Sequence, residues 1–147
     1  MTEIHMTIPS DVFDDTTDMA TPSAEQLAAM TPADRADALS TALWTRVVAD
    51  RHAAGAQWLA SVATEAERAA AAGDDDDLDA LATDGAAYVA LAVKRAADEQ
   101  AEARRRVAAI IAAMDQAELE QAAATEQAEG RTKQAGMIED AINAAQA

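Results

Sequence analysis

Cysteine is absent from the 147 residues, which excludes disulfide bonds and thiolate chemistry. Aromatic residues are nearly absent as well, and Phe13, Trp44, Trp58 and Tyr88 are the complete set. Alanine supplies most of the apolar residues; it is the best helix former, but it buries little surface. The sequence therefore predicts an all-α protein of one domain with tails, in which long helices form readily around a thin core.

Basic residues are also scarce, with 11 Lys and Arg against 27 Asp and Glu, for a formal charge of −16. Such a chain repels phosphate groups, so we expect no direct nucleic-acid binding and no binding to an anionic membrane surface. No apolar run approaches the roughly 20 residues that span a bilayer, and the N-terminus does not resemble a secretion signal. We expect a cytoplasmic protein, or one inside a phage-infected cell or a virion. The abundance of Ala, Asp and Arg suggests an actinobacterial or phage genome.

Two Thr-Pro pairs, at residues 21–22 and 31–32, suit a helix N-cap followed by proline in the first turn. Ser23 with Gln26 forms an alternative capping box for the first helix, and Thr31 with Asp34 forms a looser one for the second. The sequence therefore predicts a short helix near 23–30 and a long helix from about 32 to 72.

Apolar residues at helical spacing continue from residue 77 to 115 or beyond, which predicts a second long helix. Only a short break separates it from the first, with Gly73 expected as a left-handed cap, so the two should form an antiparallel hairpin. Val47 should then lie opposite Ala103, and Leu39 opposite Ile110, while Gly85 would allow close approach of the first helix. The expected hairpin core is Leu39, Leu43, Val47, Trp58, Val62, Leu78, Leu81, Tyr88, Val107, Ile110 and Met114.

Four consecutive aspartates, residues 74–77, follow Gly73. Carboxylates in the first turn of a helix meet free N–H groups and the positive end of the helix dipole. The competing interpretation is a calcium loop, since Asp75, Asp77 and Asp79 fit its first, third and fifth positions. Its required Gly and Glu are replaced by Ala80 and Ala86, however. We therefore expect a helix start and no metal.

The two ends of the chain are candidates for docking. Residues 1–22 carry five acids and no Lys or Arg, which is typical of a disordered acidic tail. Alternatively, Ile4, Ile8, Val12 and Phe13 dock on a partner or on this protein's own helices. After the hairpin body, residues 23–129, the segment 130–147 should hold a short amphipathic helix near 137–146. Its face, Met137, Ile138 and Ile142, must dock on this chain, a copy or another protein, because so short a helix does not persist alone.

Residues 115–129 offer Leu119 as their one large apolar side chain, which predicts a solvated or fraying extension of the second long helix. Gly130 and Gly136 should interrupt it. The basic run at residues 104–106 points in three directions on a helix, so we expect a solvated face that balances Glu99 and Glu102.

Candidates for chemistry are few. His52 has no second metal ligand at positions 48, 49, 55 or 56, so we interpret it as an ordinary polar residue of the first long helix. The chain also lacks a glycine-rich phosphate loop. We therefore expect no enzyme, no cofactor, no metal site and no small-molecule substrate.

The function predicted from these patterns is that of a non-catalytic, acidic helical interaction protein, an assembly or scaffolding component. Its long helices carry apolar stripes too wide for one hairpin to bury, so we expect a homo-oligomer or a protein partner. The alternative is an inhibitor that covers a basic surface, including one on a nucleic-acid-binding protein; a small enzyme is a third possibility. Mimicry of DNA is disfavoured because residues 73–84 carry −6 and residues 85–114 carry +2.

Overall fold

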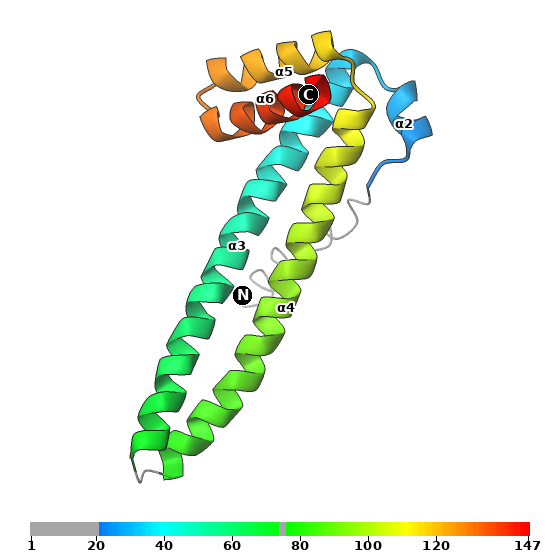
Figure 1. Ribbon diagram of the computed structural model, residues 1–147. Coiled ribbons are helices and arrows are strands. Elements are labelled where there is room, and N and C mark those ends of the chain that lie inside the picture. Colours follow the sequence, from blue (N-terminus) through cyan, green and yellow to red (C-terminus); the bar gives the residue numbers. More distant parts are fainter. Residues whose placement is uncertain (1–20, 74–75) are drawn as a thin grey trace, which may run out of the picture.

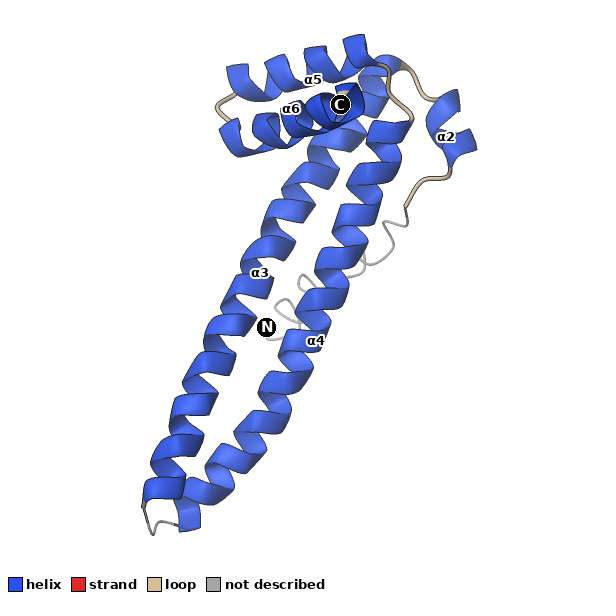
Figure 2. Ribbon diagram, in the orientation of Figure 1, coloured by secondary structure: helices blue, strands red, loops and turns tan. Residues whose placement is uncertain are grey.

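The computed structural model describes residues 21–73 and 76–147, and for residues 70 and 76–84 it describes the backbone alone. In this part of the chain five helices and no strands are present (Figures 1 and 2). They are α2 (Ala24–Ala29), α3 (Pro32–Ala72), α4 (Asp76–Ala112), α5 (Gln116–Ala128) and α6 (Thr132–Gln146). The all-α hairpin predicted from the sequence is confirmed.

The starts of α2 and α3 follow the predicted caps. Ser23 Oγ accepts a hydrogen bond from the Gln26 backbone at 3.0 Å, and the Ser23 backbone donates to Gln26 Oε1 at 2.9 Å. Thr31 Oγ1 likewise accepts from the Asp34 backbone at 3.1 Å. Each cap satisfies N–H groups that the first helical turn leaves free, and this local chemistry made both starts predictable.

α3 and α4 pack side by side in antiparallel directions (Figure 1). Gln100 Nε2 donates to Asp50 Oδ1 at 2.7 Å, and His52 Nδ1 lies 3.0 Å from Glu99 Oε1. These contacts place the register within a residue or two of the expected one. The buried residues of the two helices include alanines at intervals of seven, the spacing that keeps one seam between paired helices: Ala42, Ala49 and Ala56 on α3, and Ala96 and Ala103 on α4.

Two expectations about glycine were wrong. Gly73 does not have a positive φ; among the described glycines, Gly130 does, at 80°. A Cβ added at Gly85 would meet no atom within 4 Å, so no close approach of α3 requires that glycine. Asp74 and Asp75 lie outside the described residues, and α4 begins at Asp76 as the second half of the hairpin.

α4 ends at Ala112, three residues short of the expected end, and the chain then turns back as α5 and α6. Asp115 caps α5 by accepting from the Glu118 backbone at 2.8 Å. At the far end, Arg131 N donates to Glu126 O at 2.8 Å and Gly130 N to Gln127 O at 3.1 Å, which is a Schellman motif with Gly130 in the left-handed position.

Residues 115–129 are therefore not a solvated or fraying extension of α4, because Leu119, Ala122 and Ala123 are buried. α6 begins at Thr132, five residues earlier than expected, and Gly136 lies inside it. A longer α4 would have extended past the start of α3 with nothing to pack against; turning back instead buries Leu119.

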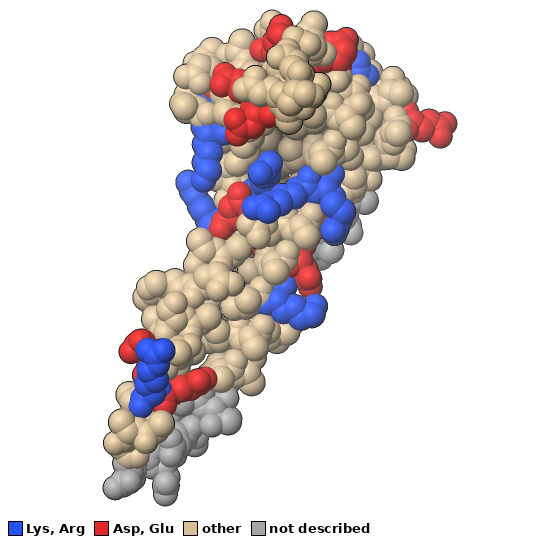
Figure 3. All heavy atoms as spheres, in the orientation of Figure 1, with Lys and Arg blue, Asp and Glu red and all other residues tan. Residues whose placement is uncertain are grey.

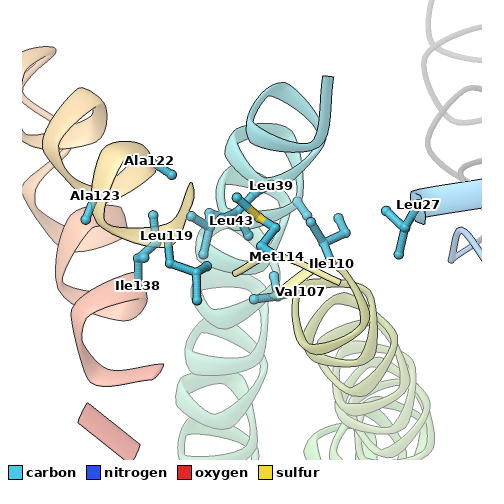
Figure 4. Packing of buried hydrophobic residues seen from close by; sticks show 11 residues of the cluster. Leu27, Leu39, Leu43, Val107, Ile110, Met114, Leu119, Ala122, Ala123 and Ile138 are labelled. Atoms are coloured by element: carbon cyan, nitrogen blue, oxygen red, sulfur yellow. The ribbon is translucent and has the colours of Figure 1, made fainter. Parts of the chain in front are cut away.

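One hydrophobic cluster holds these elements together, and all of its members lie at the end of the hairpin away from the α3–α4 connection. We call residues 23–43 and 106–147 the head, and residues 44–73 and 76–105 the arm. Figure 4 places Leu27 of α2 on one side of the paired ends of α3 and α4, and Leu119 and Ile138 on the other. The cluster consists of Leu27, Leu39, Ala42, Leu43, Val107, Ile110, Met114, Leu119, Ala122, Ala123 and Ile138.

A partly buried polar contact joins three elements of the head. The Arg35 guanidinium donates to both carboxylate oxygens of Glu118, at 2.7 and 3.1 Å, and also to the carbonyl oxygens of Leu27 and Met30, at 3.0 and 2.7 Å. These hydrogen bonds to Glu118 raise the pKa of Arg35. One side chain thus ties the C-terminal end of α2 to α3 and to α5.

The expected hairpin core is correct in the head and for Val47, and wrong for the other arm residues whose side chains are described. Leu39, Leu43, Val47, Val107, Ile110 and Met114 are buried, whereas Trp58, Val62 and Tyr88 are exposed. The side chains of Leu78 and Leu81 lie outside the described residues. The physical reason is that the alanine seam occupies the contact between α3 and α4 in the arm, so larger side chains on the flanks of each helix remain outside it.

Replacing Ile138 by alanine should remove buried contacts from the centre of the head. We expect the free energy of unfolding to fall by about 2–5 kcal/mol, the usual cost of a large-to-small change at a site that cannot collapse. Chemical denaturation monitored by circular dichroism measures this. Lys133→Ala, on the exposed side of the same helix, is the control and should change stability by less than about 0.5 kcal/mol. Equal effects would contradict the burial of α6.

Arg35→Lys should keep the positive charge but lose the bidentate contact with Glu118 and the planar fork that also reaches two carbonyl groups. We expect a lower midpoint of thermal unfolding than for the wild type. Arg68→Lys is the matched control, since Arg68 pairs with Glu65 on an exposed surface. If both variants melt like the wild type, Arg35 does not hold the head together.

Candidate protein-interaction surface

The arm exposes large apolar side chains. Trp58 and Tyr88 are 66% and 68% exposed, although tryptophan and tyrosine are usually well covered in folded proteins. The large apolar residues exposed in the described part of the chain all lie in the arm: Trp44, Trp58, Leu59, Val62, Tyr88 and Leu91. Large apolar side chains that are exposed together on one part of a soluble protein mark candidate sites of interaction.

These residues lie on one face of the hairpin. Trp44, Arg51 and Trp58 are spaced by seven residues, about two helical turns, so they share one side of α3. Tyr88, Arg95 and Glu102 share one side of α4 for the same reason. Arg51 and Arg95 line the same groove, so the two sides point the same way. We call this surface the arm face.

A shallow groove runs along the arm face, with a volume of about 540 Å³. Gly55, Ala56, Ala92 and Ala96 are among its lining residues, and a Cβ at Gly55 would meet no atom within 4 Å. Trp58 and Leu59 also line it. Small residues that lie beside exposed large ones leave a hollow that is wide enough for an apolar side chain from another segment.

The polar rim of the groove carries more positive than negative charge. Arg51 and Arg95 line it together with Glu99 and His52. His52 is exposed and its contact is with Glu99, in agreement with its interpretation as an ordinary polar residue. Around the groove the sequence is balanced: residues 44–68 hold three Arg and three acids, and residues 85–99 hold two basic residues and two acids. The excess acids of the arm lie in residues 76–84, which hold four Asp and no basic residue.

Other charged side chains of the arm pair with each other. Arg104 lies 3.5 Å from Asp50, and Arg105 donates to Glu102 and lowers the pKa of that carboxyl. Arg106, by contrast, is buried, so the expectation of a wholly solvated basic run was wrong. In the view of Figure 3, charged residues form separate groups along the arm with uncharged surface between them.

The expected docking residues at the chain ends have different outcomes. Ile4, Ile8, Val12 and Phe13 lie outside the described residues. Ile138 is fully buried in the head, and Met137 and Ile142 are partly buried against the same cluster. α6 therefore docks on its own chain, and in this conformation Ile138 is not available to a partner. A smaller apolar hollow, of about 300 Å³, lies between Met114, Leu119 and Ile142.

The arm face itself was missed as a site by sequence reasoning. Its signal was present, because the apolar stripe of residues 32–72 is wider than a single seam needs. Trp58 and Val62 were assigned to the core because they belong to this stripe. The spacing of apolar residues does not show which part of a wide stripe faces the neighbouring helix. The N-cap of α5 was also present in the sequence as Asp115 followed three residues later by Glu118.

Other classes of site find no support in the described part of the chain. None of its helices is long and apolar enough to cross a membrane, and no group of three His, Cys, Asp or Glu residues lies close enough to hold a metal. Comparison with family models, with curated proteins and with solved structures finds no match. The function is therefore inferred from the structure itself.

The alanine seam can be tested by overpacking it. Ala49 is fully buried between α3 and α4, so Ala49→Leu should push the helices apart and lower the free energy of unfolding by about 1–3 kcal/mol. Ala54→Leu, on the exposed surface of the same helix, should change it by less than about 0.5 kcal/mol. Denaturant titration of both variants measures the difference. A stabilised Ala49→Leu variant would mean that the arm has room in its core.

Proposed function

We propose that this protein is a non-catalytic interaction component whose arm face binds protein, in an assembly or scaffolding role. The observation that carries the proposal is the row of exposed apolar side chains that includes Trp58, Leu59 and Tyr88. Exposed aromatic residues are common anchors of protein interfaces, and Trp58 also lines the groove. The bound protein is a second copy of the chain or a different protein.

The location of the stabilising contacts in the head supports the proposal that the arm face is available for binding. The hydrophobic cluster and the Arg35–Glu118 contact lie in the head, so the fold does not depend on covering the arm face. A surface that the fold does not need to bury can bind and release a partner without unfolding of the protein.

The electrostatics of the arm favour this proposal over an inhibitor that covers a basic surface. Such an inhibitor needs a dense negative patch along its binding face, but the segments that carry the exposed apolar side chains, residues 44–68 and 85–99, are each neutral by sequence. The four Asp of residues 76–84 belong to the part of the arm next to the α3–α4 connection. A neutral apolar face is suited to binding by burial of nonpolar surface, which salt affects weakly.

Site-specific photo-cross-linking tests the proposal. Tyr88 is replaced by benzoylphenylalanine in the full-length protein, produced in its native cells, and the adducts are resolved by size and identified by mass spectrometry. We expect protein adducts from position 88, because its side chain is exposed on the arm face. The control places the same probe at Gln121, an exposed position on α5.

Adducts of twice the chain mass would identify a second copy, and other masses would identify a different protein. A yield from position 88 that is no higher than from position 121 would refute the proposal.

A further inference from the structure

The described chain begins at Thr21, beside α4 on the side of the helix that carries the groove. Thr21, the first described residue, lies close enough to Glu102 of α4 for its side chain to help lower the pKa of that carboxyl. Glu102, Arg95 and Tyr88 are spaced by seven residues and share one side of α4, and Arg95 lines the groove. The N-terminal segment therefore leaves the described structure on the same face that carries the groove.

The length of this segment matches the distance to be covered. Along α4, Arg95 lies about 10 Å from Glu102, and Tyr88 lies about 21 Å from it, at 1.5 Å per residue. An extended chain spans up to about 3.3 Å per residue. Val12 and Phe13 are nine and eight residues before Thr21, so the chain is long enough for either side chain to reach every part of the groove.

The chemistry of the segment also complements the groove. Residues 1–20 carry five acids and no Lys or Arg, together with Ile4, Ile8, Val12 and Phe13. The groove offers Arg51 and Arg95 on its rim and an apolar lining that includes Gly55 and Leu59. The acids of the segment are thus opposite in charge to the two arginines of the groove, and the apolar side chains of the segment match its apolar lining.

We propose that residues 1–20 bind in the groove of the arm face of their own chain, with Phe13 or Val12 in the hollow, and so compete with the protein that binds this face. This inference rests on the proposed function for the competition, while the intramolecular docking stands independently of it. A short tether gives an effective concentration in the millimolar range. An intrinsic dissociation constant of about 100 μM would thus keep the groove about nine-tenths occupied, and removing the segment would raise binding of a partner up to about tenfold.

The test uses the full-length chain with benzoylphenylalanine in place of Phe13, the one phenylalanine of the sequence. After irradiation we expect an adduct that keeps the mass of a single chain. Mass spectrometry should map it to residues 51–59 or 88–99. Leu59→Glu, which puts a carboxylate among the groove residues, should reduce the yield at least tenfold. Ala90→Glu adds the same charge at an exposed position that does not line the groove, and should leave the yield unchanged.

Three results would overturn the proposal: adducts between two chains, adducts to other proteins, or attachment outside the groove. Isotope-labelled and unlabelled chains mixed before irradiation distinguish a second copy from the same chain. As a second measurement, Phe13→Asp should raise the yield of intermolecular adducts from the probe at position 88. If position 88 forms adducts but position 13 does not attach to the groove, the proposed function survives and the intramolecular docking is wrong.

Discussion

The close contact between α3 and α4 along a row of alanines is the constraint on which the rest of the molecule depends. Ala42, Ala49 and Ala56 on α3, at intervals of seven, and Ala96 and Ala103 on α4 are buried. Small side chains allow two backbones to approach closely, but each buries little surface. A hairpin built this way is long and thin, so the large apolar residues must be buried elsewhere or remain exposed.

The two ends of the hairpin solve this problem differently. In the head, α2 covers one side and the α5–α6 pair covers the other, so that Leu39, Leu43 and Ile110 are enclosed. Arg35 adds directional contacts that fix how α2 and α5 meet α3. The described arm has no such covering helices, and Trp58 and Tyr88 face outward. Because the alanine contact buries few large side chains, those in the head are covered by other helices, whereas those in the described arm remain exposed.

Much of the hairpin could be predicted because its signals are local. Thr31 with Pro32 marks the start of α3, and α3 ends at Ala72, directly before Gly73. The head was predicted less well, because α5 lacks large apolar residues other than Leu119 and its burial depends on α6, which follows later in the chain. The arm face was not predicted, since Trp58 and Leu39 belong to the same kind of helical stripe and differ in what lies opposite them.

By itself the sequence determined α2, α3 and α4, the N-terminal caps of α2 and α3, and the antiparallel pairing of α3 with α4, since these depend on residue propensity, on hydrogen bonds between near neighbours and on a short connection. Only the tertiary structure decided which large side chains are buried. That choice depends on the rotation of α3 about its axis, which is set by the alanines that face α4, and on the return of α5 and α6 over one end. A periodic pattern places residues on a face of a helix, but the neighbouring helices determine whether that face is covered.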